Sequence, residues 1–233
     1  MTEDEAKKWV KNKVNQQKVI AECIGDNPHT SKLAIFMAGV PGAGKTEFVR
    51  GLQDSRPGVF TIIEHDRLVE YIETYSPEHY YNYRKAGSTL VTAAFDHCLK
   101  NGYSFVFDGT LSHDNGLKNI GKTLKQGYSV VVIYIHQDVQ SAWKLTQDRE
   151  LVKKRAIEKE GFIETCKKIN ANLRKVFVTF AEDKSFAFWI IKKNGAPGME
   201  NATTVLYDGP DGKERSDIEA ILETDYNVSQ LEV

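Results

Sequence analysis

The chain has 233 residues, which suit one large α/β domain or one domain with appendages. Apolar residues make up 41% and charged residues 27% of the sequence, as in globular proteins, and a net charge of -1 gives no sign of a general polyanion-binding surface. No apolar run approaches the roughly 18 residues of a membrane span and the acidic start is unlike a signal peptide, so we expect no membrane segment and a cytoplasmic location.

The N-terminal segment, residues 1–30, is predicted to be a helical extension. We interpret residues 4–24 as one amphipathic helix that ends at residues 25–28, because apolar side chains recur at roughly helical spacing at Trp9, Val10, Val14, Val19, Ile20 and Ile24. Packing against the rest of the chain is the expected role, and a docking face for a partner is the alternative.

A glycine-rich loop follows the apolar run 33–38, which we predict to be a strand. It matches GxxxxGK[ST], the phosphate-binding pattern between a strand and a helix, with Gly39, Val40, Pro41, Gly42, Ala43, Gly44, Lys45 and Thr46. Glycines let backbone N–H groups surround an anion, and the helix beginning near Gly44 adds its positive end. Lys45 is placed to reach the β- and γ-phosphates and Thr46 to ligate Mg²⁺, so the loop predicts an ATP site with its metal.

A second apolar run, residues 59–63, predicts a buried strand that ends in Glu64-His65-Asp66-Arg67. Ligands of open α/β sheets bind beyond the carboxyl ends of the strands, so we expect these carboxylates in the same crevice as the phosphate loop. Asp66 is the candidate base that accepts the proton of a substrate hydroxyl, with Glu64 as a support for this base or for the metal and as a candidate substrate contact. The alternative is that Asp66 caps the helix that follows.

Residues 75–85 contain four tyrosines, a histidine and two cations. Aromatic rings stack on sugars and bases, and Arg and Lys meet phosphate, so the segment suits a sugar, nucleoside or nucleic-acid substrate. Arg84 is its candidate substrate contact. An ordinary half-exposed start of a helix is the alternative.

Residues 103–108 form an apolar run that ends in an acid, like the Walker B element. Asp108 is therefore a candidate metal ligand, directly or through water. Gly109 and Thr110 follow at once and place a flexible backbone and a hydroxyl at the crevice. A structural turn is the competing interpretation.

Two arginines follow the next strand, which the apolar run 128–135 predicts. Arg149 and Arg155 lie in a helical segment, and its part near residues 148–162 is a candidate lid over the nucleotide. Both arginines are candidates to neutralise charge on the transferred phosphoryl group. Charge runs are usually solvated faces, which is the alternative.

The end of the chain completes the predicted layout. A long helix at 162–181 and strands at 186–191 and 203–207 close a domain over residues 31–208. We predict that residues 209–233 form an acidic tail with one short helix and a frayed end.

Together these motifs resemble the zeta-toxin family of bacterial kinases over roughly residues 33–180. The resemblance implies a P-loop kinase fold, an α/β fold of three α/β/α layers with a mainly parallel central sheet. It also implies ATP-dependent phosphorylation of the 3′-hydroxyl of UDP-N-acetylglucosamine. In the family pattern Asp66 is the base, Thr110 contacts the sugar nucleotide, and Arg149 and Arg155 bind the ATP phosphates and stabilise the transition state.

One position departs from the family pattern. The family usually has a glutamate in the helix before the third strand that helps hold the sugar, and this chain has Thr92 there. A threonine hydroxyl can bond a sugar hydroxyl but lacks the charge and reach of glutamate, so the acceptor stays open. A toxin role would further imply an antitoxin protein as partner.

Two other functions stay open on the sequence alone. The acceptor hydroxyl could belong to a nucleic acid or to another small molecule. From a different class, the chain could be an ATP-gated binding protein whose N-terminal helix or acidic tail engages a partner. Asp66, Asp108 and the arginines argue against a switch, because a switch needs no base aimed at an acceptor.

Overall fold

The computed structural model describes residues 1–26, 28–153, 158–193, 203–209 and 214–231. Its central sheet has six strands in the order β2-β3-β1-β4-β5-β6, and all neighbours are parallel except β5 and β6. The strands are β1 (Leu33–Ala38), β2 (Thr61–Glu64), β3 (Phe105–Asp108), β4 (Ser129–His136), β5 (Phe186–Lys193) and β6 (Thr203–Asp208).

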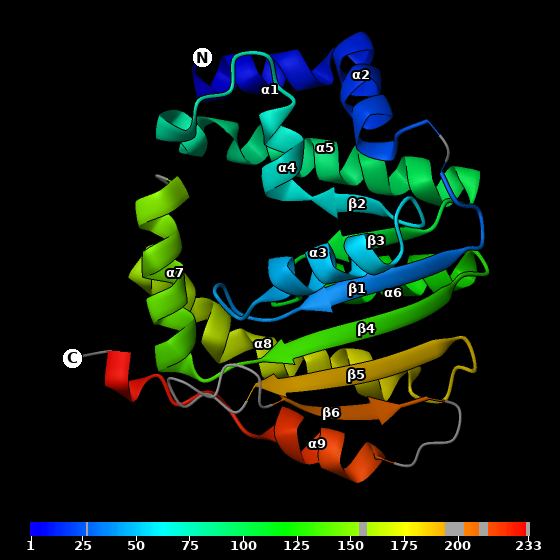
Figure 1. The fold of residues 1–233 in the computed structure, drawn as a ribbon, viewed down its shortest axis with the longest axis vertical. Coiled ribbons are helices and arrows are strands. Elements are labelled where there is room, and N and C mark those ends of the chain that lie inside the picture. The colour runs from blue at the N-terminus through cyan, green and yellow to red at the C-terminus, as the bar shows by residue number, and fades with distance from the viewer. Residues whose placement is uncertain (27, 154–157, 194–202, 210–213, 232–233) are drawn as a thin grey trace.

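Helices cover both faces of this sheet. Those in the described ranges are α1 (Glu3–Lys11), α2 (Lys13–Ile24), α3 (Lys45–Ser55), α4 (His65–Glu70), α5 (Tyr80–Asn101), α6 (Asn115–Lys125), α7 (Val139–Lys153), α8 (Lys159–Phe180) and α9 (Arg215–Glu223), with 3-10 turns η1 (Pro77–His79) and η2 (Ser229–Leu231). Figure 1 shows α3 in front of the sheet, α6 and α8 behind it, and α5 with α1, α2 and α4 beyond the β2 edge. The predicted three-layer fold with a mainly parallel sheet is confirmed. None of these described helices combines the length and apolar composition needed to cross a membrane.

The middle strands are almost continuously apolar because both of their faces are covered. Every residue of β1 from Ala34 to Ala38 is buried. Phe36, at the centre of β1, packs edge-on against Phe95 of α5 and Phe105 of β3, with ring centroids 6.4 and 5.9 Å away. This packing holds the ends of the strands in place.

The register of the sheet brings the carboxyl ends of three strands together. Met37 of β1 pairs with Asp108 of β3, and Asp108 pairs with Glu64 of β2. The Gly39 N–H donates to the carbonyl of Thr110 (3.4 Å), which joins the loops after β1 and β3. The phosphate loop and the two acidic strand ends therefore lie at one edge of the sheet.

The N-terminal segment forms two helices, so the prediction of one helix over residues 4–24 is wrong. The chain breaks at Asn12, whose backbone is extended (φ -66°, ψ 121°) and whose side chain accepts a hydrogen bond from the Val14 N–H (2.9 Å). An Asn side chain that caps a helix competes with continued helical bonding, which ends α1 and starts α2. Both helices pack against α5 through buried side chains that include Ala6, Val10, Val19 and Cys23.

The C-terminal segment packs more closely than predicted. The expected short helix is present as α9, which lies against α8 and β6 and buries Ile218 and Leu222. Beyond α9, Val228 and Leu231 are also buried, and the Tyr226 hydroxyl lies 2.9 Å from that of Tyr134 in β4. Val228 and Leu231 are therefore packed on a partner surface that the sequence pattern does not reveal.

Candidate active site

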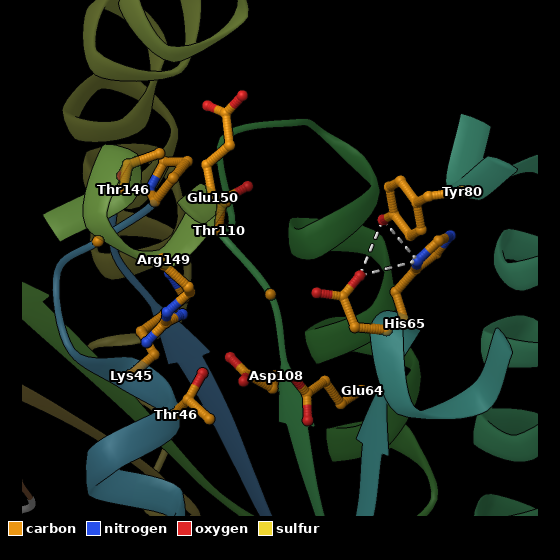
Figure 2. A pocket seen from close by; sticks show the side chains of 14 residues that line it. Lys45, Thr46, Glu64, His65, Tyr80, Asp108, Thr110, Thr146, Arg149 and Glu150 are labelled. Atoms are coloured by element: carbon orange, nitrogen blue, oxygen red, sulfur yellow. Dashed lines mark hydrogen bonds and ion pairs between the residues drawn. The ribbon is translucent and has the colours of Figure 1, made fainter. Parts of the chain in front are cut away.

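A cavity opens where the phosphate loop meets the acidic strand ends (Figure 2). Figure 2 shows Lys45, Arg149 and Thr146 on one side and His65 and Tyr80 on the other. The cavity is lined by Pro41, Gly42, Lys45, Thr46, Glu64, His65, Asp66, Tyr80, Asp108, Gly109, Thr110, Thr146, Arg149 and Glu150. Most of the side chains nominated from the sequence are thus brought together.

The phosphate loop forms one side of the cavity. Gly42 has a positive φ of 75°, and a Cβ there would collide with the carbonyl of Ala142 in α7, so the loop needs glycine to pass this close to α7. Lys45 Nζ donates to the carbonyls of Gly39 (2.8 Å) and Val40 (3.0 Å). Burial lowers the pKa of Lys45, and nearby carboxylates oppose that shift. The loop therefore presents a half-buried lysine and a helix start to one region, which suits a phosphate.

Thr46 and Asp108 point into the same part of the cavity from α3 and β3 (Figure 2). Asp108 Oδ1 is buried and has no hydrogen-bond partner among the described residues. Burial raises the pKa of Asp108, and the Lys45 ammonium acts against that rise. Mg²⁺ prefers oxygen ligands, so this carboxylate and the Thr46 hydroxyl fit an ion that arrives with nucleotide phosphates. The described residues hold no group of three or more His, Cys, Asp or Glu side chains that could bind a metal by themselves.

Asp66 lies on the opposite side of the cavity, in the first turn of α4. The Tyr80 hydroxyl donates to Asp66 Oδ1 at 2.8 Å, and His65 Nδ1 lies 3.3 Å from that hydroxyl and 3.5 Å from Oδ1. Glu64 occupies the N-cap position of α4. Asp66 is the second residue of α4 and not its N-cap, and its carboxylate accepts a hydrogen bond from Tyr80. The alternative prediction that Asp66 caps this helix is therefore wrong.

One face of α7 closes the cavity next to the phosphate loop. Thr146, Arg149 and Glu150 line the cavity, and their spacing of three to four residues places them on one side of the helix. Arg149 forms an ion pair with Glu47 of α3, with 2.7 Å between Nη2 and Oε1. The arginine is thus held beside the start of α3. Arg155, the other nominated arginine, lies outside the described residues, as does part of the proposed lid.

Two nominated substrate residues do not line the cavity. Arg84 is exposed, and its guanidinium carbon lies 5.7 Å from the centroid of the Tyr81 ring. Thr92 lies about three turns beyond Tyr80 in α5, where its hydroxyl donates to the Ser88 carbonyl (3.0 Å) and it borders a separate hollow beside α2. The resemblance to the family gave Thr92 a position along the helix, but the packing of α5 decides which of its residues face the cavity. Arg84 and Thr92 remain predicted substrate contacts that lie outside the lining of this cavity.

Several cavity residues were not nominated from the sequence. His65 stands between two nominated acids, and Thr146 and Glu150 lie one helical turn from Arg149 or beside it, so sequence spacing contained a usable signal for them. Tyr80 is different, because nothing in the sequence separates it from the neighbouring tyrosines. Thr110 lines the cavity as expected, with its hydroxyl 2.8 Å from that of Ser112.

The Zeta toxin family model matches residues 18–209. A solved chain of the PezAT chromosomal toxin–antitoxin system of Streptococcus pneumoniae is similar, with a TM-score of 0.68, 18% identity, and 95% of this chain and 92% of that chain covered. A chain of the AvrRxo1-ORF1:-ORF2 complex has a TM-score of 0.67 and 14% identity, with 98% and 72% covered. A chain of that complex with ATP has a TM-score of 0.65 and 13% identity, with 97% and 72% covered. At these identities the solved structures show the fold, and no curated protein matches the chain.

Proposed function

Because the chain belongs to the zeta-toxin family, we propose that it is a kinase that transfers the γ-phosphoryl group of ATP to a hydroxyl of a small molecule. The favoured acceptor is a sugar nucleotide such as UDP-N-acetylglucosamine, which the family resemblance implies. The observation that carries the proposal is the convergence of the phosphate loop and Asp66 on one cavity. An ATP-gated binding protein would need the loop but no carboxylate aimed at an acceptor.

The donor half of the proposed reaction depends on positioning and charge. Phosphoryl transfer needs little covalent chemistry from the protein, so catalysis comes mainly from alignment and electrostatic stabilisation. Backbone N–H groups of the loop and Lys45 would hold the β- and γ-phosphates. Arg149 would exchange Glu47 for the transferred phosphoryl group, with Arg155 as the second arginine. Thr46 and Asp108 would hold Mg²⁺, which supplies charge neutralisation when bound.

The acceptor half of the reaction centres on Asp66. Its carboxylate would accept the proton of the substrate hydroxyl while that oxygen bonds the γ-phosphorus, the bond to the bridging oxygen breaks, and ADP leaves. Glu64 and Thr110 line the same cavity and are proposed to bond other hydroxyl groups of the acceptor.

We also infer a protein inhibitor as partner. Two of the similar solved chains come from a toxin–antitoxin system and from a two-protein complex, which supports the same organisation here. Expression of the chain should then arrest growth, and Lys45→Ala should relieve the arrest. Arrest by the Lys45→Ala protein would contradict a toxic kinase activity.

The proposed activity is tested by incubation of the protein with γ-labelled ATP and separate acceptors: UDP-N-acetylglucosamine, other sugar nucleotides, oligonucleotides and a metabolite extract. Label on UDP-N-acetylglucosamine supports the favoured acceptor. Label on oligonucleotides, with binding that weakens as salt rises, would replace it with a nucleic-acid acceptor. ATP binding without transfer to any acceptor would overturn the kinase proposal.

A further inference from the structure

His65 uses both of its ring nitrogens. Nε2 lies 2.8 Å from the backbone carbonyl of Arg84 in the first turns of α5, and because a carbonyl oxygen only accepts, Nε2 is the donor. Nδ1 faces the Tyr80 hydroxyl (3.3 Å) and Asp66 Oδ1 (3.5 Å). One side chain thus joins the start of α4 to the start of α5 next to the proposed base.

The surface of α5 is shaped to receive this ring. Gly87 lies inside α5 and is buried, and a Cβ there would stand 2.5 Å from His65 Nε2 and 2.6 Å from Val69 Cγ1. Glycine is a poor residue for the interior of a helix. Its presence lets the His65 ring lie against the helix backbone at this point.

Tyr80 completes the arrangement from the first residue of α5. Its ring stands edge-on to the His65 ring, with centroids 6.1 Å apart and planes at 76°. Its hydroxyl donates to the same Asp66 oxygen that His65 approaches. A carboxylate bonded in this way is restricted in rotation, and a base must be aligned with the hydroxyl it deprotonates.

We propose that Tyr80 and His65 are positioning residues for Asp66: Tyr80 orients the carboxylate toward the acceptor hydroxyl, and His65, which is anchored to α5 through Nε2, holds the Tyr80 hydroxyl and the carboxylate in place through Nδ1. The inference rests on the proposed function, because it takes Asp66 as the base. Figure 2 shows both residues across the cavity from Lys45 and Thr46 of the phosphate loop, so we expect their role to be separate from ATP binding.

Tyr80→Phe and His65→Gln test the proposal. Tyr80→Phe removes only the hydroxyl that bonds Asp66. His65→Gln keeps an amide N–H near the position of Nε2, so it preserves the bond to the Arg84 carbonyl and loses the group that faces Tyr80 and Asp66. We expect kcat to fall about 10-fold or more in both variants, with the KM for ATP within about 2-fold and Tm close to wild type. Tyr103→Phe makes the same chemical change at the opposite end of β3 and is the control.

Asp66→Asn, measured beside these variants, distinguishes failure of the positioning role from failure of Asp66 as the base. An inactive Asp66→Asn protein together with wild-type kcat in Tyr80→Phe and His65→Gln would overturn the positioning role and leave the base in place. An active Asp66→Asn protein would overturn the base itself, and the positioning role with it. If kcat falls and ATP affinity falls by a similar factor, or Tm drops clearly below that of wild type, the residues have a structural role. Either result would also overturn the proposal.

Discussion

The two sides of the cavity are built in different ways. The donor side, residues 39–46 with Arg149, comes mainly from consecutive residues whose backbone turns around the ligand position. The acceptor side, residues 64–66 with Tyr80, joins two helices through side-chain hydrogen bonds. A local backbone motif depends little on the rest of the chain, whereas side chains from two elements depend on how those elements pack. Donor-side variants should therefore impair ATP binding, and acceptor-side variants should spare it.

Lys45→Ala should have the largest effect. It removes the ammonium that is proposed to hold the β- and γ-phosphates, so we expect kcat/KM to fall about 10³-fold or more and ATP affinity to fall with it. Transfer assays and calorimetric titration with ATP measure the two quantities. Lys144→Ala removes an exposed lysine of α7 and should behave as wild type. Phosphoryl transfer at the wild-type rate by the Lys45→Ala protein would contradict the proposal that this side of the cavity binds the ATP phosphates.

Asp66→Asn should separate the two sides of the cavity. The amide oxygen can still accept the Tyr80 hydrogen bond but cannot take the substrate proton, so kcat should fall about 10²- to 10⁴-fold. ATP affinity should stay within about 2-fold, as measured by the same titration. Glu70→Gln, a neutralised exposed carboxylate later in α4, is the control. If ATP affinity falls together with kcat, the two sides are not independent.

Asp108→Asn should lower activity while stabilising the ligand-free protein. Burial raises the pKa of Asp108, so the folded state binds a proton there more tightly than the unfolded chain does. The unfolding free energy of wild type should therefore decrease as pH rises from the ordinary carboxyl pKa through the raised one. The variant should lose this slope and unfold at a higher temperature above that range, with kcat about 10- to 100-fold lower.

Thermal unfolding across a pH series, without ATP or Mg²⁺, measures this effect. Asp96→Asn changes an exposed carboxylate that pairs with Lys122 and should move stability by less than about 1 kcal/mol. A lower Tm for Asp108→Asn would mean that the carboxylate stabilises the empty site.

Gly87→Ala should have the smallest effect, and its sign is informative. Alanine usually stabilises the interior of a helix by about 1 kcal/mol relative to glycine. Here the added Cβ would meet His65 and Val69, so we expect the unfolding free energy to fall by about 1–3 kcal/mol. Gly51→Ala in α3, where nothing lies within 4 Å of the added Cβ, is the matched control in denaturant titrations. A stabilised Gly87→Ala protein would show that the fit between α5 and His65 is loose.

The alternation of strands and helices was predictable because its signals are local. The apolar runs at β1 and β4 were recognised since strands covered on both faces contain few polar residues. The break at Asn12 was missed because its neighbours continue the apolar spacing of a helix, while the Asn side chain ends one helix and caps the next. The packing of Val228 and Leu231 was missed because their partner surface is distant in the sequence.

The sequence by itself determined the proposed donor side apart from Arg149, because eight consecutive residues after an apolar strand carry both its backbone turns and its lysine. It also placed Glu64 and Asp108 at strand ends, which parallel pairing aligns at one edge, with Asp66 two residues after Glu64. Only the tertiary structure decided that Tyr80 faces the cavity and Thr92 does not. The face of α5 turned toward the cavity depends on contacts made across the fold, and helical spacing carries no information about them.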